Sequence, residues 1–266
     1  MKVVSYLKTV PAKNNNKQKT DLLFKFIKGV DKGGDIGIIN NTDKLEDADV
    51  AIIQGWVHND ISSPHLKLRN NIIHKQVSSE KYVVCADANL FLYNDKTNPH
   101  GYLRYSFNGI FPNTGIYCDR EVDPRRWQQI SRDTNIVLED NKTHGSNILL
   151  MLQRNGGWSM TGIDVQEWAF NTINQIRFNS DRPIIIRAHP GDKNALKYLH
   201  PKFTKIKNLK NVSISSFDKP LDQDLANAWC VVNHNSSAVV GPIIKGYNCF
   251  ITDPQKSQCR EVSNND

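Results

Sequence analysis

The chain has 266 residues, a formal net charge of +7 and a pI of about 9.1, and 39% of its residues are hydrophobic. This length supports one large or two small domains, and no apolar run approaches the ~18 residues of a membrane-spanning helix. The N-terminus lacks the apolar segment of a signal peptide and the five cysteines form no Cys-x-x-Cys pair, so we expect a cytoplasmic protein.

Short apolar runs alternate along the chain with segments of helical spacing. The predicted strands are residues 3–7, 36–39, 50–53, 82–85, 148–152, 184–187, 212–214, 230–232 and 249–252. The predicted helices are residues 20–29, 65–76, 124–132, 164–178, 192–199, 221–228 and 237–245. Such alternation predicts an α/β fold with parallel sheets covered by helices on both faces.

The alternation stops between residues 89 and 147, a segment rich in Asn, Gly, Pro and aromatic residues. We therefore expect two Rossmann-like domains, residues 1–144 and 145–266, facing each other across a cleft. The basic, Asn-rich stretch 13–19 follows the first strand, where loops of parallel sheets bind ligands. The alternative for this stretch is a solvated surface loop.

Two strand ends in the second domain carry polar groups. The strand at residues 148–152 is followed by Gln153 and Arg154 and then by Gly156 and Gly157, which let a backbone approach a ligand closely. No Gly-Lys-Ser/Thr follows, so this is not a Walker A loop. The next strand ends in Arg187-Ala-His189-Pro, where the planar guanidinium suits phosphate oxygens and the imidazole suits a phosphate or ribose.

Residues 230–246 read as a buried strand, a polar turn and a helix that ends at Gly246. Asn235, Ser236 and Ser237 stand where the helix would begin, and they are typical N-cap residues. A helix N-terminus at the carboxyl end of a strand presents N–H groups to an anion, which predicts a phosphate or diphosphate site. The following strand also ends in a polar group, Asp253.

Together these segments resemble the donor-binding half of nucleotide-sugar glycosyltransferases of the two-Rossmann (GT-B) type. The match covers residues 148–254, and the nearest groups are capsule-polysaccharide and Kdo-transferase-like enzymes and small phage-type, DNA-modifying glycosyltransferases. The matching motifs are Arg-Ala-His-Pro at 187–190, Asn-Ser-Ser-Ala at 235–238, the helix closed by Gly246, and Thr-Asp-Pro at 252–254. The resemblance implies a metal-independent enzyme with a nucleotide-sugar co-substrate, expected to be a UDP-sugar, and no other cofactor.

The resemblance also implies which residues hold the donor. Many relatives carry a Glu on the helix after the Ser-Ser turn, whereas residues 239–242 here read Val-Val-Gly-Pro. Asp253 or Gln153 is the expected substitute for that carboxylate. The expected donor-binding residues are Gln153, Arg154, Gly156, Gly157, Arg187, His189, Asn235, Ser236, Ser237 and Asp253.

Glycosyl transfer to a hydroxyl needs a base near the acceptor, usually an Asp or Glu. Asp87, at the carboxyl end of the predicted strand 82–85, is our first candidate. Asp60 follows another strand end, and Asp119, Glu121 and Asp123 form a second acidic cluster. No Asp-x-Asp, His-x-x-x-His or cysteine cluster indicates a metal site.

The acceptor is expected on the first domain, where basic and aromatic residues are interleaved. The candidates are Arg104, Tyr105, Arg125 and Arg126, because aromatic rings stack on sugars or on a flipped base and arginines meet phosphates. The net charge favours duplex DNA, so a hydroxymethylated base in phage DNA is our first hypothesis for the acceptor. A surface-polysaccharide or lipid-linked acceptor fits nearly as well.

Two other functions remain open at this point. The missing helix carboxylate suits a non-catalytic nucleotide- or nucleic-acid-binding α/β protein. An epimerase of the same architecture would need acid–base carboxylates on both sides of the sugar, and only one side is well supplied.

Overall fold

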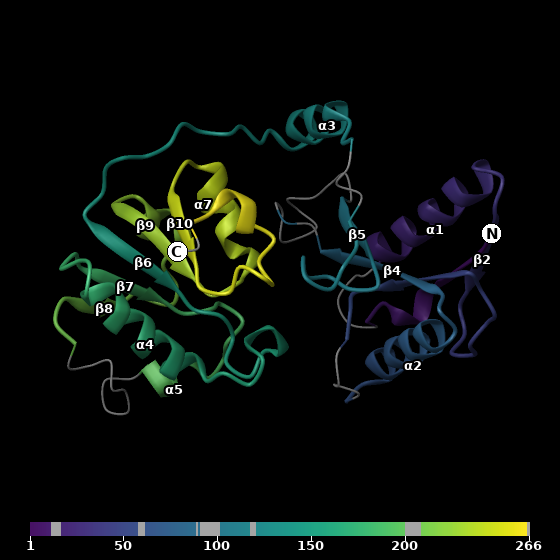
Figure 1. Cartoon of the computed structure of the whole chain (residues 1–266), viewed down its shortest axis with the longest axis horizontal. Coiled ribbons are helices and arrows are strands. Elements are labelled where there is room, and N and C mark those ends of the chain that lie inside the picture. Colours follow the sequence, from purple (N-terminus) through teal and green to yellow (C-terminus); the bar gives the residue numbers. More distant parts are fainter. Residues whose placement is uncertain are drawn as a thin grey trace. The chain divides into compact units, whose positions relative to one another are not determined.

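The computed structural model describes residues 1–11, 17–57, 62–88, 90, 102–117, 121–199 and 209–264. The chain divides into two compact units, Met1–Asn135 (unit 1) and Ile136–Asp266 (unit 2) (Figure 1). This division lies before the expected boundary at residue 144, because the segment after residue 135 is hydrogen-bonded to unit 2. Glu139 N–H donates to the Ile244 carbonyl at 2.8 Å, and Lys142 N–H donates to the Gly246 carbonyl at 2.7 Å.

Unit 1 contains a five-stranded sheet in the order β2-β1-β3-β4-β5. Its strands are β1 (Lys2–Tyr6), β2 (Ile36–Asn40), β3 (Val50–Gln54), β4 (Tyr82–Ala88) and β5 (Leu103–Phe107). The first four are parallel, and β5 runs antiparallel to β4 at the edge. The helices of this unit are α1 (Lys17–Lys32), α2 (Pro64–Ser78) and α3 (Pro124–Thr134).

Helices α1 and α2 cover opposite faces of the unit 1 sheet (Figure 1). Leu23 of α1 belongs to an apolar cluster with strand residues such as Ile52, and Ile72 of α2 belongs to the cluster on the other face with Ile53. Because successive side chains of a strand point to opposite faces, a strand buried on both sides is apolar throughout, as β3 nearly is.

Unit 2 contains a five-stranded parallel sheet in the order β10-β9-β6-β7-β8. Its strands are β6 (Asn147–Met151), β7 (Ile184–Arg187), β8 (Val212–Ile214), β9 (Ala228–Asn233) and β10 (Asn248–Ile251). Its helices are α4 (Val165–Arg177), α5 (Ala195–Leu199), α6 (Leu221–Leu225) and α7 (Val240–Ile244). The chain winds outward from β6 in both directions, so the strand order reverses between β6 and β9. This is the topological switch point, where sheets of this kind bind ligands.

The expected fold class, two Rossmann-like α/β sheets, is confirmed. Strand β5 was missed because its alternating polar and aromatic residues carry no buried apolar run. The helix expected at residues 237–245 is a 3-10 turn, Ser237–Val239, followed by the short α7. Among the described residues, no helix is both long and apolar enough to cross a membrane.

Candidate functional site

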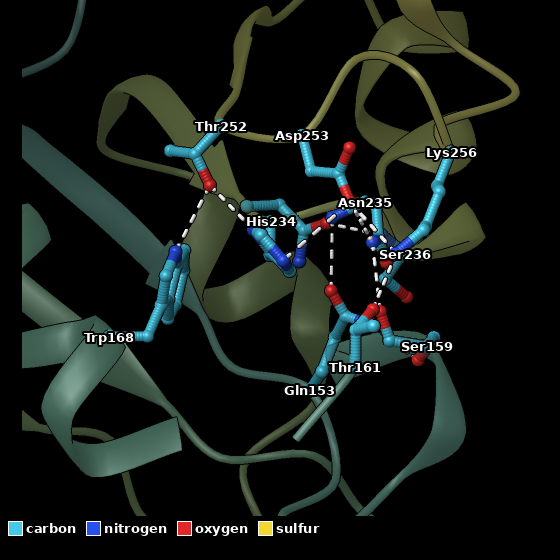
Figure 2. Close-up of polar contacts among 11 residues, drawn as sticks. Gln153, Ser159, Thr161, Trp168, His234, Asn235, Ser236, Thr252, Asp253 and Lys256 are labelled. Carbon is cyan, nitrogen blue, oxygen red and sulfur yellow. Dashed lines mark hydrogen bonds and ion pairs between the residues drawn. The ribbon is translucent and has the colours of Figure 1, made fainter. Parts of the chain in front are cut away.

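The loops after β6 and β9 meet at the switch point of unit 2, and the Gln153 side chain joins them (Figure 2). Gln153 is 5% exposed. Its Oε1 accepts a hydrogen bond from the Asn235 N–H at 2.9 Å, and its Nε2 donates to the Ser159 hydroxyl at 2.8 Å. Both ends of the amide are therefore engaged, as a buried polar group requires, and the two loops are held in one geometry.

Asn233, the last residue of β9, organises the turn that follows. Its Nδ2 donates to the Met151 carbonyl at 2.8 Å, and its Oδ1 accepts from the Ser236 N–H at 2.6 Å. The Ser236 hydroxyl accepts from the Ala238 N–H at 3.2 Å. The N–H groups of Asn235, Ser236 and Ala238 are thus bonded inside the protein. This differs from the unpaired helix end that the sequence predicts, because these three N–H groups already have partners.

Asp253 follows β10, and its carboxylate belongs to the polar cluster drawn in Figure 2. Its Oδ2 accepts from Asn235 Nδ2 at 2.9 Å and lies 3.8 Å from both His234 Nε2 and Lys256 Nζ. The Asp253 side chain is 20% exposed. Asn235 Nδ2 also donates to the Ser159 carbonyl at 3.1 Å, whereas its buried Oδ1 has no partner in the described part of the chain. The cluster thus offers a carboxylate to hydroxyl donors.

Trp168 of α4, Thr252 and His234 form a hydrogen-bonded chain, and the His234 ring lies beside Asp253 (Figure 2). Trp168 Nε1 donates to the Thr252 hydroxyl at 3.0 Å, and that hydroxyl lies 2.8 Å from His234 Nδ1. The Thr252 oxygen accepts from Trp168, and its own hydrogen can be donated to Nδ1 in the tautomer that carries the imidazole proton on Nε2, towards Asp253. Trp168, His234 and Thr252 also line a pocket of about 560 Å³ beside α4.

The Gly-Gly loop after β6 is anchored to the loop after β7 by Asp192, which is 3% exposed. Its carboxylate accepts from the Asn155 N–H at 2.9 Å and from the Tyr198 hydroxyl at 2.6 Å. Gly156 has φ +69, in the left-handed region that favours glycine. An added Cβ on Gly157 would come within 2.9 Å of the Arg154 carbonyl. The conformation of this loop therefore favours glycine at both positions.

His189 lies in the same region, half-buried, with its Nδ1 accepting from the Gly191 N–H at 2.9 Å. Burial and the nearby Arg154 guanidinium lower the pKa of His189, against the opposing effect of Asp192. The imidazole is therefore neutral at pH 7 and carries its proton on Nε2. Arg154 and His189, from two strand ends, form a pair of hydrogen-bond donors.

Arg187 has a partner inside the fold. Its Nη1 donates to Asp224 Oδ2 at 2.6 Å and to the Lys219 carbonyl at 2.8 Å. The Asp224 side chain is fully buried, and it also accepts from the Ser215 hydroxyl at 2.7 Å and pairs with Lys219 Nζ at 2.7 Å. Arg187 thus ties β7 to α6, and its role as a donor ligand stays a prediction.

The base candidate of unit 1, Asp87, lies on β4 opposite Arg104 of β5, and Arg104 Nη2 donates to Asp87 Oδ2 at 2.5 Å. The ring of Tyr105 packs 5.2 Å from that of Phe26 on α1. The other basic candidates lie on α3. They are Arg125, which pairs with the helix-capping Asp123, and Arg126, whose guanidinium lies 5.0 Å from the Tyr102 ring centre. Asp60 and Asp119 lie outside the described residues.

The structure brings most of the predicted donor residues of unit 2 to its switch-point edge in two groups. Gln153, Asn235 and Asp253 are joined by hydrogen bonds, and Ser159 bonds both Gln153 and Asn235. Ser236 is held separately by Asn233, and Ser237 opens the adjoining 3-10 turn. Sequence reasoning missed the residues that support this cluster: Ser159, Thr161, Trp168, His234, Thr252 and Lys256. The motifs around 233–238 and 252–254 contain His234 and Thr252, but nothing in the sequence singles out Trp168.

The chain, with its two Rossmann-like sheets, has a GT-B-like fold. The β-Kdo 2,4-transferase KpsC of Thermosulfurimonas dismutans is similar in structure with a TM-score of 0.50 and 12% identity, over 85% of this chain and 77% of that chain. The β-Kdo 2,7-transferase KpsC of the same organism also has a TM-score of 0.50 and 12% identity, over 94% and 78%. These similarities establish the fold alone. No family model and no curated protein matches the sequence.

The buried His234 and the half-buried His189 make the stability of unit 2 depend on pH. Burial is the main cause that lowers the pKa of both His189 and His234, so the unfolded chain binds more protons as pH falls below about 6.5. The contribution of the two neutral imidazoles to the free energy of unfolding is complete above that pH. This contribution is lost as the pH falls towards the lower pKa values that the histidines have in the folded state. We expect the melting temperature to fall as the pH is lowered from 7.5 to 5. In the double variant His189→Gln with His234→Gln, we expect this fall to be smaller than in the wild type. A melting temperature that rises on acidification would contradict this assignment.

Proposed function

We propose that the chain is a glycosyltransferase that binds a nucleotide-sugar, expected to be a UDP-sugar, at the switch point of unit 2. The observation that carries this proposal is the convergence of Gln153, Asn235 and Asp253 at the carboxyl ends of β6, β9 and β10 in a GT-B-like fold. Parallel sheets bind nucleotides at this position, and a polar cluster with a partly exposed carboxylate suits a hydroxyl-rich ligand.

In this proposal Asp253 accepts hydrogen bonds from ribose or sugar hydroxyls. It takes the place of the glutamate that the Val-Val-Gly-Pro stretch lacks. The contacts from Asn235, His234 and Lys256 hold the Asp253 carboxylate on one side, through Oδ2, which leaves Oδ1 for the ligand. The diphosphate is assigned to the Arg154 guanidinium, the Nε2–H of His189 and the Ser236–Ser237 hydroxyls. Cations and N–H donors placed there stabilise the charge of the departing diphosphate.

The base in this proposal is Asp87 of unit 1. Its carboxylate takes the proton of the acceptor hydroxyl while the hydroxyl oxygen bonds to the anomeric carbon. The bond from that carbon to the diphosphate breaks, and its electron pair leaves with the nucleoside diphosphate. No step requires a metal.

The acceptor that we propose first is a hydroxymethylated base in phage DNA, and a surface polysaccharide is the second candidate. The net charge of +7 supports a polyanion. If the acceptor is duplex DNA, the logarithm of the binding constant falls linearly with the logarithm of salt concentration, because phosphate contacts release counterions. Affinity that does not change with salt would argue against DNA.

The enzyme proposal is tested by the release of free nucleoside diphosphate from UDP-, GDP- and CMP-sugars. A transferase hydrolyses its donor slowly when acceptor is absent, whereas a non-catalytic binding protein leaves the nucleotide-sugar intact. Binding without any hydrolysis or transfer, over a panel of hydroxyl acceptors, would replace the enzyme with the binding protein. An epimerase would instead return an isomerised nucleotide-sugar.

Removing the two hydroxyls of the polar turn is expected to weaken donor binding. Ser236→Ala with Ser237→Ala should cost about 1–3 kcal/mol of binding free energy, the scale of lost hydrogen bonds to a charged ligand. Calorimetry measures this change. Ser180→Ala is the matched control, because the Ser180 hydroxyl also accepts a backbone N–H two residues on, that of Arg182 at 3.2 Å. Unchanged donor affinity in the double variant would remove the turn from the phosphate site.

A further inference from the structure

Arg69 of α2 is a buried cation whose hydrogen-bond partners are all neutral. The residue is 6% exposed. Nε and Nη2 donate to the Thr9 carbonyl at 3.0 and 2.7 Å, and Nη2 also donates to Gln54 Oε1 at 2.8 Å. Within the described ranges, Nη1 has no hydrogen-bond partner and no carboxylate forms an ion pair with this guanidinium. Asp87 acts on this charge electrostatically without forming an ion pair with it. A buried charge without an ion pair is costly, and an added anion would offset that cost.

The position of Arg69 is the switch point of unit 1. Gln54 ends β3, and Thr9 ends the 3-10 turn that directly follows β1. The Thr9 hydroxyl accepts from the Gln54 N–H at 3.0 Å, so the two strand ends are joined where the strand order β2-β1-β3-β4 reverses. Unit 1 thus holds a guanidinium at the switch point of its own sheet, the position that the polar cluster occupies in the sheet of unit 2.

Gly55 keeps space beside the unpaired nitrogen. Its φ is +72, and an added Cβ would come within 2.9 Å of Arg69 Nη1. Its N–H donates to the Ala86 carbonyl at 2.7 Å, which aligns the ends of β3 and β4. Any larger residue would crowd the guanidinium and strain the backbone.

A second guanidinium shares this edge. Arg104 pairs with Asp87 at 2.5 Å, and its Nε is buried without a partner among the residues described. Burial and the Asp87 charge raise the pKa of the Cys85 thiol on β4, and the charges of Arg69 and Arg104 both oppose that rise. Two guanidiniums and the single carboxylate of Asp87 leave a net positive charge of one among these three side chains.

We propose that Arg69, assisted by Arg104, binds one anionic group, a carboxylate or a phosphate, at the carboxyl ends of β1 and β3. Resting on the proposed function, the group belongs to the acceptor and presents its hydroxyl to Asp87. Arg69 Nη1 supplies the new hydrogen bond, and the excess positive charge supplies the attraction. The acceptor is therefore an anionic molecule rather than a neutral sugar.

NMR on the full chain tests this site with two probes, inorganic phosphate and acetate, titrated at constant ionic strength. No nucleotide is added, because the diphosphate of UDP is itself an anion that would compete for the site. The readouts are the Gly55 amide and the Arg69 Nε–H, which report unit 1 alone, so the result does not depend on whether unit 2 binds a nucleotide. We expect saturable shifts at both signals, and the probe that binds more tightly identifies the anion as phosphate or carboxylate.

Arg69→Met should weaken the affinity that the Gly55 amide reports at least tenfold, and Arg104→Gln should weaken it less. Lys28→Gln, which removes an exposed charge from α1 of the same unit, should leave it unchanged. If Arg69→Met does not fold, Arg69→Lys replaces it: it keeps the charge, loses the fork of donors and should bind more weakly than the wild type. The absence of saturable shifts with either probe, or equal affinity in the Arg69 variant, would show that Arg69 only braces Thr9 and Gln54.

Discussion

Asp87→Asn is expected to lower the rate of sugar transfer by about 100- to 10,000-fold, the usual contribution of a general base, while the affinity for the nucleotide-sugar stays unchanged. The amide cannot accept the acceptor proton, but its oxygen still accepts the hydrogen bond that Arg104 donates to Asp87. Single-turnover transfer and donor titration on the same preparation separate these two effects.

The matched control for this variant is Asp47→Asn. Asp47 is an exposed carboxylate of the same unit that pairs with Lys81 at 2.8 Å, so the substitution removes the same charge away from the proposed chemistry. A melting curve of each variant excludes unfolding as the cause of any lost rate. Full transfer activity in Asp87→Asn would assign the base to Glu121 or Asp119 instead.

Asp224→Ala is expected to lower the free energy of unfolding of unit 2 by about 3–5 kcal/mol, because it leaves the inward-facing guanidinium of Arg187 without its counter-charge. The Asp224 side chain is fully buried and joins β7, α6 and the segment after β8 through Arg187, Lys219 and Ser215. Hydrogen exchange of the β7 amides, followed with increasing denaturant, measures the change within unit 2.

Asp222→Ala is the control for that experiment. Asp222 lies two residues earlier on the same helix, and its ion pair with Lys245 is solvent-exposed, so its loss should cost less than about 1 kcal/mol. Equal costs for the two variants would show that the Asp224 network adds nothing beyond a surface pair. Such a result would also mean that Arg187 is not needed for stability and is available to bind the diphosphate.

The buried strands could be predicted from sequence because strands covered on both faces are nearly continuous apolar runs. Residues 184–187 and 212–214 match β7 and β8 at both ends. Gly246 was predicted as a helix stop, and it has φ +75 after α7, with the Asp140 carbonyl where a Cβ would lie. Strand β5 was not predicted, because an edge strand needs only a neighbouring strand to pair with and no apolar run.

Part of the candidate site could also be predicted, since the carboxyl ends of parallel strands meet at one edge. That rule selects Gln153, Asn235 and Asp253, which the structure joins. The occupation of the turn's N–H groups by Asn233 and Ser236 could not be predicted, because it depends on side-chain conformation. Arg69 lies within a polar helix sequence, and only its burial distinguishes it.

Titration calorimetry tests most directly whether unit 2 binds a nucleotide-sugar through the cluster around Asp253. The full chain is titrated with UDP-, GDP- and CMP-sugars as the wild type, as Asp253→Asn and as Asp181→Asn, which changes an exposed carboxylate of the same unit. We expect saturable binding of one donor class at one site per chain, weakened at least tenfold by Asp253→Asn and unaffected by Asp181→Asn. Failure of the wild type to bind any of these nucleotide-sugars, or equal affinity in Asp253→Asn, would contradict the claim.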